Sequence, residues 1–218
     1  MLFRSEVNGE VVVKMGTRID PSVDIVRVDG ERVQVNEEMV YFVLNKPRGV
    51  HSTMSDELGR PCVGDLVGTR LKEGQGLFHV GRLDAATEGL LLLTNDGELA
   101  CKLTHPKFLK KKVYHVYLDK NLTAHDMQQI ADGITLEDGE VHADAIEYAD
   151  DNDKSQVGIE IHSGKNRIVR RIFESLGYHV TKLDRVMFAG LTKKNLRRGD
   201  WRYLTEKEVD MLRMGAFE

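Results

Sequence analysis

The fold is decided by one stretch, which joins charged residues to an apolar run: Gly81-Arg82-Leu83-Asp84-Ala85-Ala86-Thr87-Glu88-Gly89-Leu90-Leu91-Leu92-Leu93-Thr94-Asn95-Asp96-Gly97. The leucines predict a buried strand from Gly89 to Thr94, and Gly81 to Asp84 is expected to be the loop before it. Asp84 therefore stands at the mouth of a core, two residues after Arg82. A nearby cation favours the charged form of a carboxylate, so the pattern indicates an ionised Asp84. An isolated Arg-x-Asp pair would instead be an ordinary surface ion pair.

The rest of the chain predicts many strands and few helices. Apolar alternation predicts strands at 40–44, 113–118, 141–148 and 157–162. Capping residues and spaced apolar residues predict helices at 98–104, 121–131 and 167–176. Because strands and helices do not alternate regularly, this order of elements favours an α+β fold.

The amino-terminal segment is predicted to be a separate small β element. Its short β-branched runs are punctuated by glycines, and Asp29-Gly30 is a tight-turn dipeptide. We place the domain boundary between residues 37 and 38, which gives domains 1–37 and 38–218.

Composition excludes several classes of protein. Neither the two cysteines, Cys62 and Cys101, nor the histidines have metal-ligand spacing, so we expect a reduced protein without a metal. No apolar run reaches the roughly 20 residues that span a bilayer, and the amino terminus does not resemble a signal peptide. We therefore expect a cytoplasmic protein without a membrane partner.

The net charge of −4 conceals a segregation of charge along the chain. Basic residues outnumber acidic ones from Lys165 to Arg213, and a second group of lysines lies at 107–112, just before Tyr114. Such groups bind phosphates where they converge in space. The pattern predicts a phosphate-binding face, and an ordinary solvated surface is the alternative.

Four motifs resemble, in order, those of the pseudouridine synthases of the ribosomal small-subunit/large-subunit type. In chain order they are Leu44–Val50, Gly81–Gly97, Lys112–Val116 and Gly164–Arg171. The tail from Leu183 to Glu208 also fits, so the resemblance covers most of the chain. The first motif continues to Leu66 in a form closer to the large-subunit enzymes than to the small-subunit ones.

The resemblance implies a fold as well as an activity. It implies a mixed, mainly antiparallel sheet of the pseudouridine synthase fold, with a catalytic cleft across it. It also implies that residues 1–37 are a truncated RNA-binding module of the ribosomal-protein alpha-L type. Residues 38–218 are then the catalytic domain.

The resemblance further assigns three catalytic residues. Asp84 is implied to be the catalytic carboxylate, acting as base or nucleophile, and Arg170 its ion-pair partner. Tyr114 is implied to stack on the target base and to manage a proton; a half-buried strand aromatic is the alternative. Arg82 is expected to hold the flipped RNA backbone or its own loop.

Five more residues are expected to bind substrate. Ile168 and Val169 are expected to form the apolar wall of the pocket, although the family pattern has Gln where Ile168 stands. Arg167, Lys111 and Lys112 are expected to contact the RNA.

Two charged residues keep alternative interpretations. Lys46 is either a phosphate contact or a charge at a strand end. Glu88 could form a glycosidase-like pair with Asp84, but the leucine strand beside it favours a role in bracing the loop.

The sequence therefore predicts an enzyme that isomerises one uridine of ribosomal RNA, more in keeping with the large subunit, to pseudouridine. Base flipping is expected, because the reacting atoms are inaccessible within a stack. No cofactor is expected, and the partner is ribosomal RNA or a ribosome-assembly intermediate bound by a monomer. The alternatives are a non-catalytic RNA-binding assembly factor on the same fold, and a nucleoside or sugar hydrolase.

Overall fold

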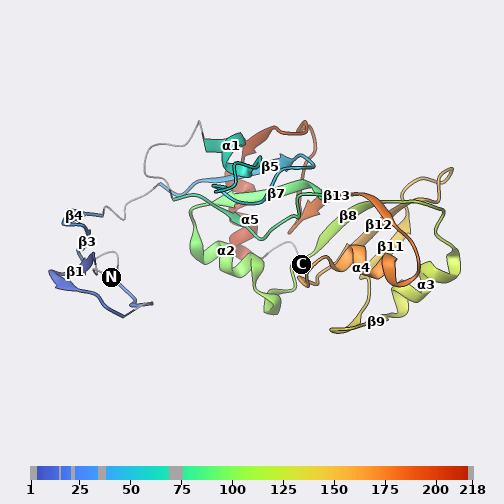
Figure 1. Ribbon diagram of the computed structural model, residues 1–218, viewed down its shortest axis with the longest axis horizontal. Coiled ribbons are helices and arrows are strands. Elements are labelled where there is room, and N and C mark those ends of the chain that lie inside the picture. Colours follow the sequence, from blue (N-terminus) through green and yellow to red (C-terminus); the bar gives the residue numbers. More distant parts are fainter. Residues whose placement is uncertain (1–3, 15, 21–22, 34–37, 69–75, 216–218) are drawn as a thin grey trace. The chain divides into compact units, whose positions relative to one another are not determined.

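The chain divides into two compact units, Met1–Glu38 and Met39–Glu218 (Figure 1). The computed structural model describes residues 4–215 apart from 15, 21–22, 34–37 and 69–75. Residue 37, on one side of the predicted domain boundary, lies outside the described residues. The RNA-binding role of the smaller unit stays a prediction.

The smaller unit contains a four-stranded antiparallel sheet in the order β2-β1-β3-β4. Its strands are β1 (Ser5–Val7), β2 (Glu10–Val11), β3 (Val26–Val28) and β4 (Glu31–Arg32). Asp29 and Gly30 both have positive φ, 54° and 83°, as a two-residue hairpin turn of this kind requires. No hydrophobic side chain is buried in the described part of this unit, which therefore gains little from apolar burial.

The larger unit is built on a nine-stranded sheet with the path β11-β12-β8-β13-β7-β5-β15, while β14 pairs with β13 and β6 with β7. All its ladders are antiparallel except the β13–β7 pair, which confirms the predicted mixed, mainly antiparallel α+β fold. The strands of this sheet are β5 (Tyr41–Lys46), β6 (Phe78–Val80), β7 (Glu88–Thr94), β8 (Lys112–Leu118), β11 (Ala145–Tyr148), β12 (Gln156–Ile161), β13 (Val180–Phe188), β14 (Leu191–Thr192) and β15 (Trp201–Tyr203). A separate hairpin joins β9 (Ile134–Leu136) to β10 (Gly139–Val141).

Helices cover both faces of this sheet. They are α1 (Val63–Val67), α2 (Gly97–Thr104), α3 (Ala124–Asp132), α4 (Ile168–Ser175) and α5 (Glu206–Met214), with a 3₁₀ turn η2 at Pro106–Phe108. Residues of α1, α3 and α4 pack in one hydrophobic cluster, and residues of α2 and α5 pack in a second. Figure 1 shows α3 and α4 beside β11 and β12, and α2 and α5 on one side of β7.

The four consecutive leucines of β7 are explained by burial on both faces of this strand. Side chains alternate between the faces of a strand, so Leu91 and Leu93 join the first cluster while Leu90 and Leu92 join the second. All four are fully buried. A central strand covered on both faces has no polar side to show, which confirms the predicted buried strand.

Two predicted elements differ from the structure. The strand expected over 141–148 is two strands, because the chain leaves β10 at Val141 and enters β11 only at Ala145. The helix expected from residue 121 begins at Ala124, because the Thr123 side chain accepts a hydrogen bond from the Asp126 amide and caps the helix there.

The parallel β7–β13 pair forms a seam between the two halves of the sheet. Glu88 lies opposite Asp184 and Gly89 opposite Arg185. Gly89 has a φ of +111°, and a Cβ there would meet the backbone of Arg185 and, at 2.6 Å, the Asp184 Oδ1 atom. A glycine is therefore required at this crossing, which brings the loop before β7 and the middle of β13 together.

Candidate active site

One cavity of about 480 Å³ gathers most of the predicted site residues. This volume falls in the roughly 300–1,000 Å³ range of small-molecule pockets. Its predicted lining residues are Arg82, Asp84, Lys112, Tyr114, Arg167, Ile168 and Val169. Arg170, Lys46 and Lys111 are not among the lining residues.

Asp84 lies in a loop that is fixed by backbone contacts from other segments. The Ser52 hydroxyl donates to the Leu83 carbonyl at 2.7 Å and accepts from the Leu83 amide at 3.1 Å. The Gly49 amide donates to the Ala85 carbonyl at 2.6 Å. The Asp84 side chain is 42% exposed, so the carboxylate stands open at the cavity rather than buried in the core.

The expected ion pair between Asp84 and Arg170 is absent, although both residues are described. Asp84 Oδ2 lies 3.7 Å from Arg167 Nη1 instead. Arg170 is buried and donates from Nη1 to the Val180 carbonyl at 2.8 Å and from Nη2 to the Ala86 carbonyl at 3.2 Å. Burial lowers the pKa of Arg170, and the charge of Asp84 partly opposes this shift. Arg170 therefore holds the backbone of the Asp84 loop rather than its carboxylate.

Arg167 occupies an unusual position at the start of α4. It is the N-cap residue, and its backbone is left-handed with a φ of 49°. Its side chain is 44% exposed and also lies 3.9 Å from Glu174. An exposed pair at these distances is weak, so Arg167 remains available to a substrate phosphate.

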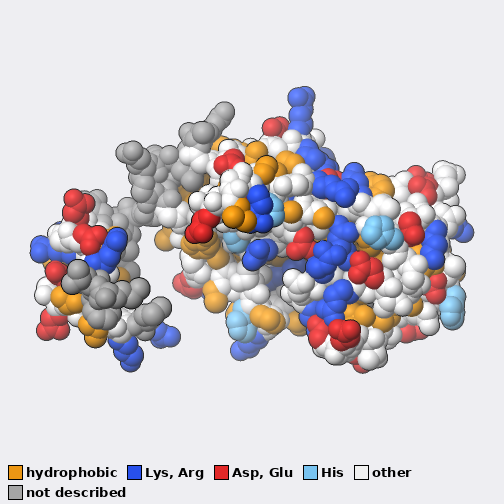
Figure 2. Space-filling view, viewed as in Figure 1, with side chains coloured by type: hydrophobic (Ala, Val, Ile, Leu, Met, Phe, Trp, Pro, Cys, Tyr) orange, Lys and Arg blue, Asp and Glu red, His pale blue; other side chains and the backbone are white. Residues whose placement is uncertain are grey.

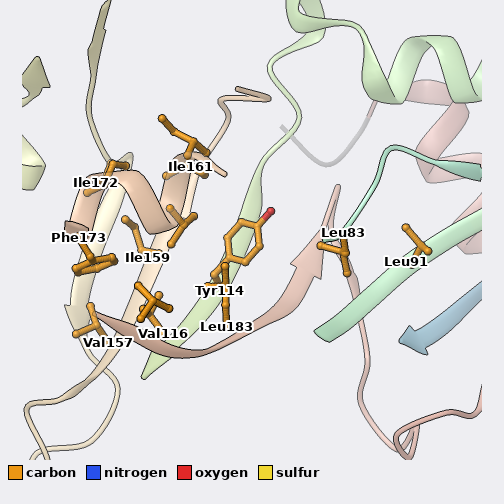
Figure 3. Packing of buried hydrophobic residues seen from close by; sticks show 14 of the residues in the cluster. Leu83, Leu91, Tyr114, Val116, Val157, Ile159, Ile161, Ile172, Phe173 and Leu183 are labelled. Carbon is orange, nitrogen blue, oxygen red and sulfur yellow. The ribbon is translucent and has the colours of Figure 1, made fainter. Parts of the chain in front are cut away.

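Tyr114 belongs both to the core and to the cavity. Its side chain is only 8% exposed and lies in the first hydrophobic cluster. Figure 3 shows its ring projecting from β8, with the hydroxyl pointing away from Val116 and Leu183. In the sheet Tyr114 lies directly opposite Arg185 of β13. The two interpretations of Tyr114, strand aromatic and site residue, are therefore compatible.

Lys46 contacts the backbone of its own segment. It is fully buried, and its Nζ atom donates to the carbonyls of Val50 at 2.6 Å and Pro47 at 3.0 Å. Burial lowers the pKa of Lys46 to about 8, and Asp84 opposes the shift. These contacts favour the interpretation of Lys46 as a charge at a strand end, and a phosphate contact stays a prediction.

The lysine group at 107–112 does not form one phosphate-binding surface. Lys110 is buried, and Lys111 forms an ion pair with Glu160 at 2.9 Å. The Nζ atom of Lys112 donates to the carbonyls of Lys110, His162 and Ser163 at 3.1, 3.3 and 3.4 Å, and burial lowers the pKa of Lys112 to about 8. Lys112 lines the cavity, whereas Lys111 lines a different pocket.

Part of the basic carboxyl-terminal segment is also engaged within the protein. Arg198 pairs with Glu88 and Asp184, and Lys193 lies 2.5 Å from Asp184. Lys182 of β13 lies 3.2 Å from Glu88, so this carboxylate pairs with a cation of the neighbouring strand. In Figure 2, Lys and Arg side chains gather on the visible face of the larger unit, and Asp and Glu side chains lie among them.

The sequence reasoning missed Arg185 as a site residue. Arg185 is 3% exposed and lines the cavity together with Phe188. Both residues lie on β13, a strand that was not predicted because Asp184 and Arg185 interrupt its apolar residues. The β-branched and apolar residues around them, from Val180 to Phe188, were the available signal.

Neither a metal-binding cluster nor a membrane-spanning helix occurs in the described part of the chain. That part of the chain contains no group of three or more His, Cys, Asp or Glu side chains arranged to hold a metal ion. None of its helices has the length and apolar character needed to cross a membrane.

Comparison with known proteins identifies the class to which this fold and cavity belong. Residues 40–175 match the RNA pseudouridylate synthase family. An uncharacterized RNA pseudouridine synthase from Mycobacterium tuberculosis is 45% identical over 210 residues, which cover 96% of this chain and 83% of the relative. The chain therefore belongs to the RNA pseudouridylate synthase family and is an RNA pseudouridine synthase.

Two further relatives agree with this assignment. The ribosomal large subunit pseudouridine synthase B of Bacillus subtilis is 41% identical over 211 residues, covering 95% of this chain and 84% of the relative. A crystal structure of a pseudouridylate synthase superposes with a TM-score of 0.73 at 30% identity, covering 96% of this chain and 89% of that one.

Proposed function

We propose that this enzyme isomerises one uridine of ribosomal RNA, in the large subunit, with Asp84 as the reacting carboxylate. The observation that carries the proposal is the cavity in which an open Asp84 carboxylate faces Tyr114 and the apolar Ile168 and Val169. The choice of the large subunit is supported by the name of the Bacillus relative and by the form of the first motif.

The reaction exchanges one glycosyl bond for another. The bond between uracil N1 and ribose C1′ breaks, the base turns, and a bond forms between C5 and C1′. C5 then loses its proton and N1 gains one, so atoms and electrons balance without an oxidant or reductant. Asp84 serves as base or as nucleophile in the first step.

The cavity walls fit the need to retain a detached base. Ile168 and Val169 are buried and come from the first turn of α4, and Tyr114 comes from β8. A flipped uracil would lie against the Tyr114 ring between these apolar walls, where water cannot intercept it. Arg82 is exposed and lines the same cavity, which supports a contact with the backbone of the flipped nucleotide.

The geometry favours an enzyme over a binding factor of the same fold. A carboxylate at the mouth of a base-sized cavity weakens RNA binding, because it repels phosphates. A reacting group accounts for that cost, whereas simple RNA binding does not.

The test is to map pseudouridine in ribosomal RNA from cells with the protein, without it, and with Asp84→Asn. We expect one large-subunit site to disappear in both altered strains. Purified Asp84→Asn should bind the RNA and fold normally but fail to turn over, because an amide is nearly isosteric but cannot act as base or nucleophile. Turnover by purified Asp84→Asn, or free uracil as the product of the wild-type enzyme, would contradict the proposal.

A further inference from the structure

Arg185 faces the space that a bound base would occupy. It lies directly opposite Tyr114 in the β8–β13 ladder, and both residues line the cavity. Directly opposed residues of an antiparallel pair have their side chains on one face, with Cβ atoms about 4.5–5.5 Å apart. A base stacked on Tyr114 therefore has the guanidinium of Arg185 beside it.

The hydrogen-bonding capacity of Arg185 is incompletely used. Its Nε atom donates to the Leu90 carbonyl at 2.8 Å, and its guanidinium lies over the Phe188 ring at 4.8 Å. Its Nη2 atom is buried without a hydrogen-bond partner. No carboxylate among the described residues lies within 4 Å of this guanidinium, although the side chain is 97% buried. An unpaired buried cation is costly, so the arrangement calls for an acceptor that arrives with the substrate.

Two other cations are close enough to interact with Arg185, namely Lys112, which lines the cavity, and Lys46, which does not. After burial itself, the charge of Arg185 is among the causes that lower the pKa of Lys46 and of Lys112. The carboxylate that acts on Lys46 is Asp84, which is itself at the cavity mouth. The carboxylate that acts on Lys112 is Asp144, which does not line the cavity. A group that becomes negative during the reaction would be favoured here.

We propose that Arg185 donates to a carbonyl oxygen of the flipped uracil and stabilises the negative charge that the base carries when it detaches from the ribose. This inference rests on the proposed function. When N1 leaves C1′ with the bonding electrons, the charge spreads over N1 and the two carbonyl oxygens, and it disappears again as C5 joins C1′. A fixed donor that meets charge only in the transition state raises kcat rather than affinity.

Arginine suits this task better than lysine in the same place. Its guanidinium stays charged under all conditions and offers several donors in one plane, so one N–H can hold Leu90 while another reaches the base. Lys46 and Lys112, by contrast, have pKa values near 8 and are already occupied by backbone carbonyls.

The test compares two substrates whose bases differ in leaving-group ability. An RNA stem-loop with uridine at the target site is compared with the same RNA carrying 5-fluorouridine, whose electron-withdrawing fluorine makes the base a better leaving group. Loss of the original glycosidic bond is followed in single turnovers. Arg185→Gln should lower the uridine rate about 10²- to 10³-fold with little change in KM. The loss on 5-fluorouridine should be at least about tenfold smaller.

Two further variants separate this role from a structural one. Arg185→Lys keeps the charge and should recover part of the rate, and it carries the test if Arg185→Gln fails to fold. Arg198→Gln removes a guanidinium from the other face of the same seam, and any rate loss should be equal on both substrates. Equal losses on both substrates for the Arg185 variants, or a change in KM alone, would overturn the inference while leaving pseudouridine formation intact. A wild-type enzyme that makes no pseudouridine would instead remove the proposed function itself.

Discussion

The two faces of the β7–β13 seam use charge in opposite ways. On one face Glu88 and Asp184, which lie opposite each other, are surrounded by Lys182, Lys193 and Arg198. On the other face Arg185 lies beside Tyr114 with no carboxylate within ion-pairing distance among the described residues. Glu88, Asp184 and Arg185 are all buried, so the burial of these central residues does not explain the difference. The carboxylates of the first face have ion-pair partners within the protein, whereas the cation of the second face has none among the described residues.

This difference follows from the position of the seam in the sheet. The parallel pairing between β7 and β13 spans only two residue pairs, Glu88 with Asp184 and Gly89 with Arg185. So short a ladder contributes few backbone hydrogen bonds, and the ion pairs on the first face add contacts that join the strands. Because the structural charges are gathered on that face, the opposite face is free for chemistry.

The largest effect on the seam as a whole is expected from Gly89→Ala. The added Cβ would collide with the Arg185 backbone and the Asp184 side chain, and alanine strongly disfavours a φ of +111°. Strain and overpacking together should lower the free energy of unfolding by about 4 kcal/mol and disturb both faces at once. Chemical denaturation measures the first effect and single turnovers the second. Gly97→Ala, at a helical glycine whose Cβ would meet only Phe78 at 3.9 Å, is the matched control.

A smaller effect, confined to one face, is expected from Glu88→Gln. The substitution leaves Lys182 and Arg198 without one of their carboxylates and should lower the free energy of unfolding by about 2 kcal/mol, since both partners are partly exposed. Glu98→Gln breaks an exposed pair with Lys102 and should change it by less than about 0.5 kcal/mol. The folded Glu88→Gln enzyme should keep the single-turnover rate of the wild type. A large loss of that rate would mean that the two faces are not separate in function.

The loop that carries Asp84 and the central strand could be predicted from the sequence, because both depend on residues that are neighbours in the chain. Four leucines in a row require cover on both faces, and that requirement also fixes where the preceding loop must end. The motif resemblance then placed Asp84, Tyr114, Ile168 and Val169 in one site, and the structure brings them to one cavity.

The predictions that the structure does not favour concern charges whose roles depend on distant segments. Lys46 and Lys110 are covered by other parts of the fold, and nothing in the neighbouring sequence reports that burial. The spacing between Arg167 and Arg170 is one helical turn, so sequence alone could not decide which of them meets Asp84. Arg185 was missed because a charged residue inside a strand looks like an interruption until its neighbours across the sheet are known.

A phosphate contact made by Arg82, at the edge of the cavity, should change the salt dependence of RNA binding. Arg82 is exposed beside the cavity, and its loss in Arg82→Gln should reduce the slope of log affinity against log salt by about 0.7 to 0.9 if it meets one phosphate. Lys111→Gln is the comparison, because Lys111 already pairs with Glu160 and should change the slope much less. Affinities measured over a salt series decide this, and equal slopes for wild type and Arg82→Gln would remove Arg82 from the phosphate contacts.

At neutral pH the smallest expected effect is the pH-dependent contribution to stability that comes from Lys46, the buried last residue of β5. Its pKa is lowered by burial to about 8 in the folded protein, whereas in the unfolded chain it should keep its ordinary value of 10.5. Between these two values the unfolded chain binds more protons, so the contribution of Lys46 to stability rises as pH rises. Below about pH 8 the lysine is charged in both states, and the buried charge is a constant cost.

Lys46→Met should therefore remove a rise in stability rather than stability at every pH. Measured by chemical denaturation, the free energy of unfolding of the wild type relative to Lys46→Met should increase by about 2–3 kcal/mol from about pH 7 to about pH 10. Lys112 also has a pKa of about 8, but it is present in both proteins and cancels in this difference. A difference that stays flat over this range would mean that Lys46 keeps an ordinary pKa.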